Sequence, residues 1–224
     1  TKGNRDLHIL YGSQSGNSEG LAEKWKKEGL KYGLNPTVHD MDGFDINSMT
    51  NMSRVMIVCS TWGEGEMPDS AEALWDSINA EGVPKMENTH FSVCALGDTS
   101  YEYFCQSGIE WDGRFQELGG TRLVDRVDCD VDYEDPAEAW SKNALAHMAA
   151  VDGTGKFQAE MVEAIKTEIE SGGGVKAGGA APAATASTPA PSVGDGALSE
   201  IMAGDRDLHL LFGSQSGNSE GLCA

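Results

Sequence analysis

The sequence predicts an α/β fold in which a parallel sheet carries helices on both faces. Two observations predict it. Short apolar runs alternate with amphipathic stretches over residues 1–150, and the least regular segments of this region directly follow apolar runs. Strands that alternate with helices are typical of parallel sheets. Ligands of such sheets bind beyond the carboxyl ends of the strands, so the same pattern indicates where a site should lie.

Five apolar runs have the length of strands. The most apolar is Arg54–Ser60, in which five consecutive apolar residues suit a strand buried on both faces. The first run ends at Gly12, a residue typical of a strand end. The expected strands are residues 7–11, 37–40, 54–60, 91–96 and 121–124.

Helical spacing of apolar residues marks the segments between the strands. In residues 18–32, Leu21, Trp25 and Leu30 recur at helical intervals with lysines between them. The expected helices of the domain are residues 18–32, 71–80 and 136–148, with another helix that closes over residues 113–118, and a further amphipathic helix is expected over residues 156–170.

Four parts are expected along the chain. Residues 1–150 form the α/β domain and residues 151–170 a helical extension. Residues 171–204 form a linker rich in glycine, alanine and proline, which cannot build a core. Residues 205–224 match residues 4–23 at 15 of 20 positions. Because so short a segment cannot fold as this domain, we expect it to be the truncated start of a second, tandem copy.

The formal net charge of −20 bears on partners. It disfavours nucleic acid and anionic membrane surfaces, which would repel the chain, and it favours a basic protein partner. No apolar run approaches the length of a membrane helix and no signal-peptide pattern is visible, so we expect a cytoplasmic protein. The five cysteines form no C-x-x-C pair and the histidines are scattered, so we expect free thiols and no metal site.

The loop after the first strand has the composition of an anion site. Residues 12–19 are small and polar, and successive backbone N–H groups at a helix start would point inward. The loop lacks Lys and Arg and lacks the G-K-[ST] ending of a P-loop, so neutral donors would hold a phosphate that is not cleaved. The alternative is a tight turn with Ser18 as helix cap. The expected phosphate-binding residues are Ser13, Gln14, Ser15, Gly16, Asn17 and Ser18.

The loops after the third and fourth strands carry aromatic residues that could contact a ligand. Trp62 directly follows the most apolar strand, where an indole would suit stacking on a planar ligand, unless it packs in the core. Gly63 and Gly65 beside it permit unusual backbone angles, including a peptide that can flip. Residues 97–108 place three aromatics within four positions, one of which could cover the other face of a flat ring. Together with the phosphate loop, these features describe a site for FMN, and no second phosphate loop is present for FAD.

Three motifs carry a resemblance to a known family. The segments G-S-Q-S-G-N-S-E, S-T-W-G-E-G-E-M-P-D and L-G-D-T-S-Y-E-Y-F-C-Q-S-G resemble the three FMN loops of flavodoxins. The third motif, with the F-Q-E-L-G-G-T-R-L-V-D-R-V-D-C-D-V-D-Y that follows, is most similar to the flavodoxin domain of sulfite reductase flavoproteins, which are diflavin reductases like cytochrome P450 reductase. The resemblance spans about residues 5–150. It implies a flavodoxin-like three-layer sandwich with a five-stranded parallel sheet in the order 2-1-3-4-5.

The resemblance also implies the ring contacts. Tyr101 matches the tyrosine that stacks on the flavin, and the backbone of residues 61–65 matches the stretch that contacts the ring. Trp62 stands where the family often has another aromatic or a polar residue, and S-G-N-S replaces the usual T-G-N-T while keeping the hydroxyls. Beyond the phosphate loop, the expected cofactor-binding residues are Ser60, Thr61, Trp62, Gly63, Glu64, Gly65, Leu96, Gly97, Asp98, Tyr101, Tyr103, Phe104 and Cys105.

The function implied is electron transfer through FMN, one or two electrons at a time. The donor would be an FAD- and NADPH-binding reductase domain or protein, and the acceptor a basic-faced oxidoreductase or haem protein, with neither nucleic acid nor membrane as partner. We expect no catalytic acid, base or nucleophile, because the flavin carries the redox chemistry. A backbone carbonyl near Gly63 or Glu64 is expected to accept a hydrogen bond from flavin N5–H.

Several readings stay open. Residues 151–224 contain none of the reductase domain of the diflavin enzymes, so whether this chain is an enzyme by itself is uncertain. A flavin-dependent quinone reductase and a flavodoxin-fold interaction module without flavin are the alternatives. Acidic residues expected near the flavin edge would steer a basic partner; they are Glu64, Glu66, Asp69, Asp128, Asp130, Asp132, Glu134 and Asp135.

Overall fold

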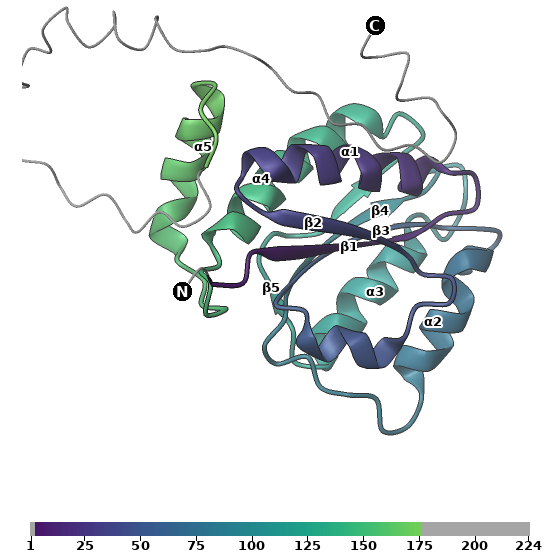
Figure 1. Cartoon of the computed structure of the whole chain (residues 1–224). Coiled ribbons are helices and arrows are strands. Elements are labelled where there is room, and N and C mark those ends of the chain that lie inside the picture. The colour runs from purple at the N-terminus through teal and green to yellow at the C-terminus, as the bar shows by residue number, and fades with distance from the viewer. Residues whose placement is uncertain (1–2, 176–224) are drawn as a thin grey trace, which may run out of the picture. The chain divides into compact units, whose positions relative to one another are not determined.

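A parallel sheet forms the middle layer of the fold (Figure 1). This computed structural model describes residues 3–175, so the repeat at 205–224 and most of the expected linker lie outside the described residues. The strands are β1 (Asp6–Gly12), β2 (Asn35–Asp40), β3 (Arg54–Ser60), β4 (His90–Leu96), β5 (Thr121–Arg122) and β6 (Val127–Cys129). They run in the order β2-β1-β3-β4-β5, which confirms the predicted order 2-1-3-4-5.

The fifth position of the sheet is divided between two short strands. The prediction of one strand over residues 121–124 was wrong in extent, because β5 ends at Arg122 and β6 pairs further along β4. Side-chain bonds explain the break: Val124 N donates to Ser92 Oγ, and Arg122 and Arg126 both converge on the carboxylate of Asp112. Two arginines that pair with one buried carboxylate draw the chain away from the strand ladder.

Helices cover both faces of the sheet. The α-helices are α1 (Asn17–Lys31), α2 (Asp69–Asn79), α3 (Gln106–Glu117), α4 (Glu134–Ala150) and α5 (Val162–Glu170), and the 3-10 helices are η1 (Ile46–Asn51) and η2 (Ala159–Met161). In Figure 1, α1 and α4 lie on one side of the sheet and α2 and α3 on the other. The sequence prediction missed η1 and recognised only the closing part of α3, residues 113–118, whereas the helix begins at Gln106. The early start follows a left-handed turn at Cys105, whose φ of 58° is unusual for a residue with a side chain.

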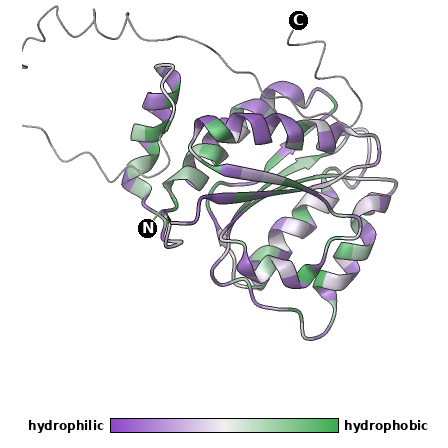
Figure 2. Cartoon of the chain, viewed as in Figure 1, coloured by the Kyte–Doolittle hydropathy of each residue, from purple (hydrophilic) through white to green (hydrophobic). Residues whose placement is uncertain are grey.

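The two faces have separate apolar cores. Leu7 and Ile9 of β1 and Trp25 of α1 belong to the core under α1, α4 and α5, whereas Leu10 and Trp111 belong to the core under α2 and α3. In Figure 2 the hydrophobic colour appears on strands behind β2, whereas β2 itself and much of α1 carry the hydrophilic colour. Alternation of side chains along β1 therefore feeds both cores.

The carboxyl ends of β1, β3 and β4 meet at one edge of the sheet, because all the strands are parallel and these three are neighbours. The loops that follow them are the three that the sequence singled out. Among residues 3–175, no helix is both long enough and apolar enough to cross a membrane.

Candidate functional site

A cavity of about 500 Å³ opens between the three loops at this edge. Its size lies within the range of cofactor and small-ligand pockets, about 300–1,000 Å³. The lining residues come from the three loops and from the segment after β6; they are Gln14, Ser15, Asn17, Ser60, Thr61, Trp62, Gly63, Leu96, Gly97, Asp98, Tyr101, Tyr103, Val131 and Tyr133.

The phosphate loop forms a turn in which three backbone amides have no partner among the described residues. Ser13 Oγ accepts a hydrogen bond from Gly16 N at 2.9 Å, and Gly16 is left-handed with φ of 89°. No acceptor for the N–H groups of Ser15, Asn17 or Ser18 is found within residues 3–175. These amides stand at the N-terminus of the 15-residue helix α1, where the helix dipole favours an anion.

Ser18 shows that the loop is more than a capped turn. Its side chain is fully buried, and its Oγ has no hydrogen-bond partner among the described residues. Gly16 occupies the cap position and no side chain caps the helix, so the alternative that Ser18 is the helix cap is wrong. A buried hydroxyl without a partner is costly, which suits a loop built to receive acceptor oxygens from a ligand.

The phosphate loop is fastened to the start of α2. Ser13 N donates to Ser70 Oγ at 2.9 Å. The Gln14 amide bonds twice to Asp69, since its Oε1 accepts from Asp69 N and its Nε2 donates to the carboxylate. The side chain of Gln14 therefore holds the shape of the loop, and the residue also borders the cavity.

The aromatic residues of the second and third loops stand open to solvent at the cavity. Trp62 is 54% exposed and Tyr101 is 58% exposed, and both line the cavity. The alternative that Trp62 packs in the core is therefore wrong. Exposed indole and phenol rings that border one cavity suit a flat aromatic ligand.

Asp130 ties the third loop to the segment after β6. Its carboxylate accepts from Thr99 Oγ1 at 2.6 Å, from Thr99 N at 3.0 Å and from Val131 N at 2.8 Å. These bonds, the one from the Thr99 hydroxyl most of all, lower the pKa of Asp130, which favours its ionised form next to the lining residue Val131.

Not every residue expected in the site borders the cavity. Phe104 and Cys105 pack behind Gly97, and Cys105 is fully buried, where burial raises the pKa of its thiol to about 12. Ser13, Gly16 and Ser18 belong to the phosphate loop but do not line the cavity, and Glu64 and Gly65 line a neighbouring cavity instead.

Two lining residues were missed by the sequence prediction. Val131 and Tyr133 follow β6 and complete the cavity wall. Recognising the apolar positions of Val127–Cys129 as a separate strand would have indicated a fourth loop at the same edge. A strand of only three residues is too short for its alternating pattern to be recognised in the sequence.

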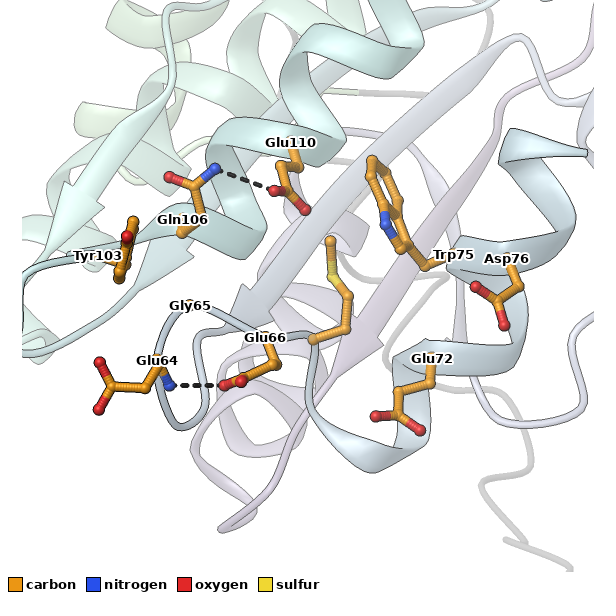
Figure 3. Close-up of a pocket in the computed structure, with 10 residues that line it drawn as sticks. Glu64, Gly65, Glu66, Glu72, Trp75, Asp76, Tyr103, Gln106 and Glu110 are labelled. Atoms are coloured by element: carbon orange, nitrogen blue, oxygen red, sulfur yellow. Dashed lines mark hydrogen bonds between the residues drawn. The ribbon is translucent and has the colours of Figure 1, made fainter.

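A second cavity, of about 560 Å³, lies behind the second loop between α2 and α3 (Figure 3). Trp75 and Met67 form its apolar part, and Tyr103 borders both cavities. Five carboxylates line it, those of Glu64, Glu66, Glu72, Asp76 and Glu110.

Comparisons with known proteins agree with this geometry. The family described as flavodoxin matches residues 9–140. The sulfite reductase [NADPH] flavoprotein alpha-component of Bacillus subtilis is 44% identical over 149 residues, which are 66% of this chain and 25% of that protein. The same component of Vibrio parahaemolyticus is 40% identical over 157 residues, 70% of this chain and 25% of that protein. The chain thus spans about a quarter of the length of these curated relatives.

A solved structure supports the fold. The flavodoxin of Streptococcus pneumoniae TIGR4 superposes with a TM-score of 0.59 at 21% identity and covers 65% of this chain and 98% of its own. The match to residues 9–140 takes in more than half of the 224 residues and all three loops. The chain belongs to the flavodoxin family, whose cofactor is FMN.

Proposed function

We propose that this chain binds FMN in the cavity of about 500 Å³ and passes one or two electrons from a reductase to a protein acceptor. The donor we infer is an FAD- and NADPH-binding reductase domain or protein. The observation that carries the proposal is the meeting of unpartnered backbone amides with exposed aromatic rings at one cavity.

The residues present fit the two ends of FMN. The amides of Ser15, Asn17 and Ser18, with the buried Ser18 hydroxyl, would hold the phosphate with neutral donors. Trp62 and Tyr101 would hold the ring system. The segment at Gly97 and Asp98 would border the ribityl chain and the ring edge.

When bound, FMN supplies the electron-accepting and electron-donating chemistry. The chain's own groups position the cofactor and set the electrostatic surroundings. The carboxylate of Asp98 at the cavity, and that of Asp130 next to the lining residue Val131, would disfavour added negative charge on the ring. Within residues 3–175, no basic side chain lines the cavity to offset them. We therefore expect a strongly donating reduced cofactor.

The acidic surface supports a basic partner. Glu64 and Glu66 of the second loop, with Glu72, Asp76 and Glu110, bring five carboxylates around the second cavity, next to Tyr103 of the first. Figure 3 shows these side chains around one opening. A basic face on an oxidoreductase or haem protein would be steered toward the edge of the cofactor site.

The repeat supports a tandem arrangement. Residues 213–222 reproduce residues 12–21 without change, including the whole phosphate loop. We infer that 1–150 is one FMN-binding unit, 151–170 its helical extension, 171–204 a linker, and 205–224 the start of a second unit.

The first experiment is to incubate the purified protein with FMN, remove free cofactor by desalting, and record the visible spectrum. Retained flavin with bands shifted from those of free FMN supports the proposal and permits a reductive titration. A colourless protein that is nonetheless folded by circular dichroism would contradict it and favour an interaction module without flavin.

A further inference from the structure

The second loop is a closed turn between Trp62 and Glu66. Trp62 N donates to Glu66 O at 3.0 Å, and Glu66 N returns a bond to Trp62 O at 2.8 Å. Gly63 and Gly65 between them are left-handed, with φ of 53° and 107°. The turn sits between the two cavities, since Gly63 borders the first and Glu64, Gly65 and Glu66 border the second.

The side chain of Glu66 folds back into its own turn. Its Oε2 accepts a hydrogen bond from Glu64 N at 2.6 Å (Figure 3). The same oxygen lies against Gly63, where a Cβ atom would collide with it. Gly63 is thus needed twice, for the left-handed backbone and for the room that the carboxylate occupies.

The backbone of Glu66 is itself fixed by hydrogen bonds. Its carbonyl oxygen accepts from Trp62 N and also from Ser107 Oγ at 2.9 Å, which anchors the residue to the first turn of α3. The carboxylate therefore starts from a backbone that is held on two sides.

The bond from Glu64 N selects one orientation of the Gly63–Glu64 peptide. A trans peptide is planar, so its N–H and C=O point in opposite directions. With the N–H directed to the Glu66 carboxylate, the Gly63 carbonyl is turned away from that carboxylate. No donor to the Gly63 carbonyl is found within residues 3–175. The group left free at this edge of the cavity is then an acceptor and not a donor.

We propose that Glu66 is a positioning residue that holds the Gly63–Glu64 peptide with its N–H away from the FMN cavity and its carbonyl available there. The inference rests on the proposed function of that cavity for its consequence, but the hydrogen bond itself exists without FMN. Holding the peptide in advance lowers the ordering cost of cofactor binding.

The first test needs no cofactor. In the protein without FMN, the amide exchange and proton shift of Glu64 are measured by NMR in the wild type, in Glu66→Ala and in Glu64→Gln. The wild type and Glu64→Gln should show a protected, downfield Glu64 (or Gln) amide, and Glu66→Ala should lose about three- to tenfold in protection, the range of one modest hydrogen bond. Equal protection in the wild type and Glu66→Ala would overturn the proposal, whatever the cofactor does.

The second test separates the hydrogen bond from the charge. Glu64→Gln and Glu66→Ala each remove one carboxylate from the same turn, so both should favour the anionic cofactor alike through charge. Loss of the bond should make FMN bind about three- to tenfold more weakly in Glu66→Ala than in Glu64→Gln. Glu66→Gln keeps an acceptor oxygen and should resemble Glu64→Gln.

Two outcomes are kept apart by this design. Identical FMN affinities in all three variants would overturn the positioning role while leaving the FMN site intact. Failure of the wild type to bind FMN would contradict the proposed function, and the NMR comparison would still decide whether Glu66 holds the peptide.

Discussion

Arg54 is a fully buried cation that faces carbonyl oxygens. Its guanidinium donates to the carbonyls of Met148, Val151 and Asp152 at the end of α4, at 3.1, 2.7 and 2.8 Å, and to that of Asn4 at 3.0 Å. Burial, followed by the charge of Arg5, lowers its pKa to about 10, so it remains charged at neutral pH.

Replacing this arginine should lower the free energy of unfolding more than any substitution at the cavity does. Arg54→Met leaves several carbonyls at the end of α4 without a donor, and we expect a loss of about 3–5 kcal/mol in the free energy of unfolding. Urea denaturation measures it. Arg54→Lys keeps the positive charge but not the planar guanidinium, so it should lose less. A loss below about 1 kcal/mol in Arg54→Met would contradict the stabilising role of these hydrogen bonds.

Ser18 should behave in the opposite way. Its hydroxyl has no partner in the described residues, so Ser18→Ala should leave the stability of the cofactor-free protein within about 0.5 kcal/mol or increase it. FMN affinity should fall about tenfold to a hundredfold, the cost of a bond to a charged group. Riboflavin, which has no phosphate, is the control: titrations should show no such loss, and an equal loss would mean a damaged loop.

At the scale of elements, α3 approaches the sheet through a glycine. A Cβ on Gly108 would collide with the side chain of Ala95 on β4 and lie 2.9 Å from its Cα. Gly113 on the same helix has nothing within 4 Å of such an atom. Both glycines are helical, but only Gly113 has room for a Cβ atom.

These glycines should respond to alanine with opposite signs. Gly108→Ala forces α3 away from β4 and should lower the free energy of unfolding by about 1–3 kcal/mol. Gly113→Ala should raise it by about 0.5–1 kcal/mol through helix propensity. Thermal unfolding of the pair decides the matter, and destabilisation by both would show that α3 is packed differently.

Strands β1 and β2 share a histidine pair. His8 Nδ1 and His39 Nε2 are 3.0 Å apart, a hydrogen bond that needs at least one neutral ring. Burial, then the charge of His39, lowers the pKa of His8 against the pull of Asp6, and burial lowers that of His39. Burial also lowers the pKa of a third histidine, His90.

The pair predicts a dependence of stability on pH. Since the folded pKa values lie below the unfolded value of about 6.5, the unfolded state binds more protons as the pH falls through that value. Stability present above about pH 6.5 should therefore be lost progressively below it. In the double variant His8→Gln/His39→Gln, urea midpoints from pH 7.5 to 5 should fall less steeply. An unchanged slope would assign the effect to His90 or to carboxylates.

For the whole molecule, the net charge of −20 predicts salt-sensitive association. With FMN bound and chemically reduced, reduction of a basic haem protein such as cytochrome c should slow by more than about tenfold between 0.01 and 0.5 M salt, as screening shortens the reach of the acidic surface. Stopped-flow rates measure it. A neutral quinone serves as the control and should show little change; a haem-protein rate independent of salt would contradict steering.

Sequence and structure agree best where the signal is local. The apolar run Arg54–Ser60 was predicted to the residue, and the loops after the first, third and fourth strands were recognised from composition. Repeating patterns and turn residues act over a few positions, so they can be read along the chain. The first turns of α3 were not recognised, because the aromatic-rich loop before them was taken to continue to Gly108, two residues past the start of the helix at Gln106.

The sequence by itself determined the α/β layers, the strand order through family resemblance, and the three loops that meet at the site. Only the tertiary structure decided three features. They are the split of the fifth strand, whose flanking arginines pair with Asp112 of α3, the place of Val131 and Tyr133 in the cavity wall, and the position of the Glu66 carboxylate against Gly63. These features depend on groups brought together from distant segments or on the handedness of single glycines. Neither distance in space nor backbone handedness leaves a periodic trace in the order of residues.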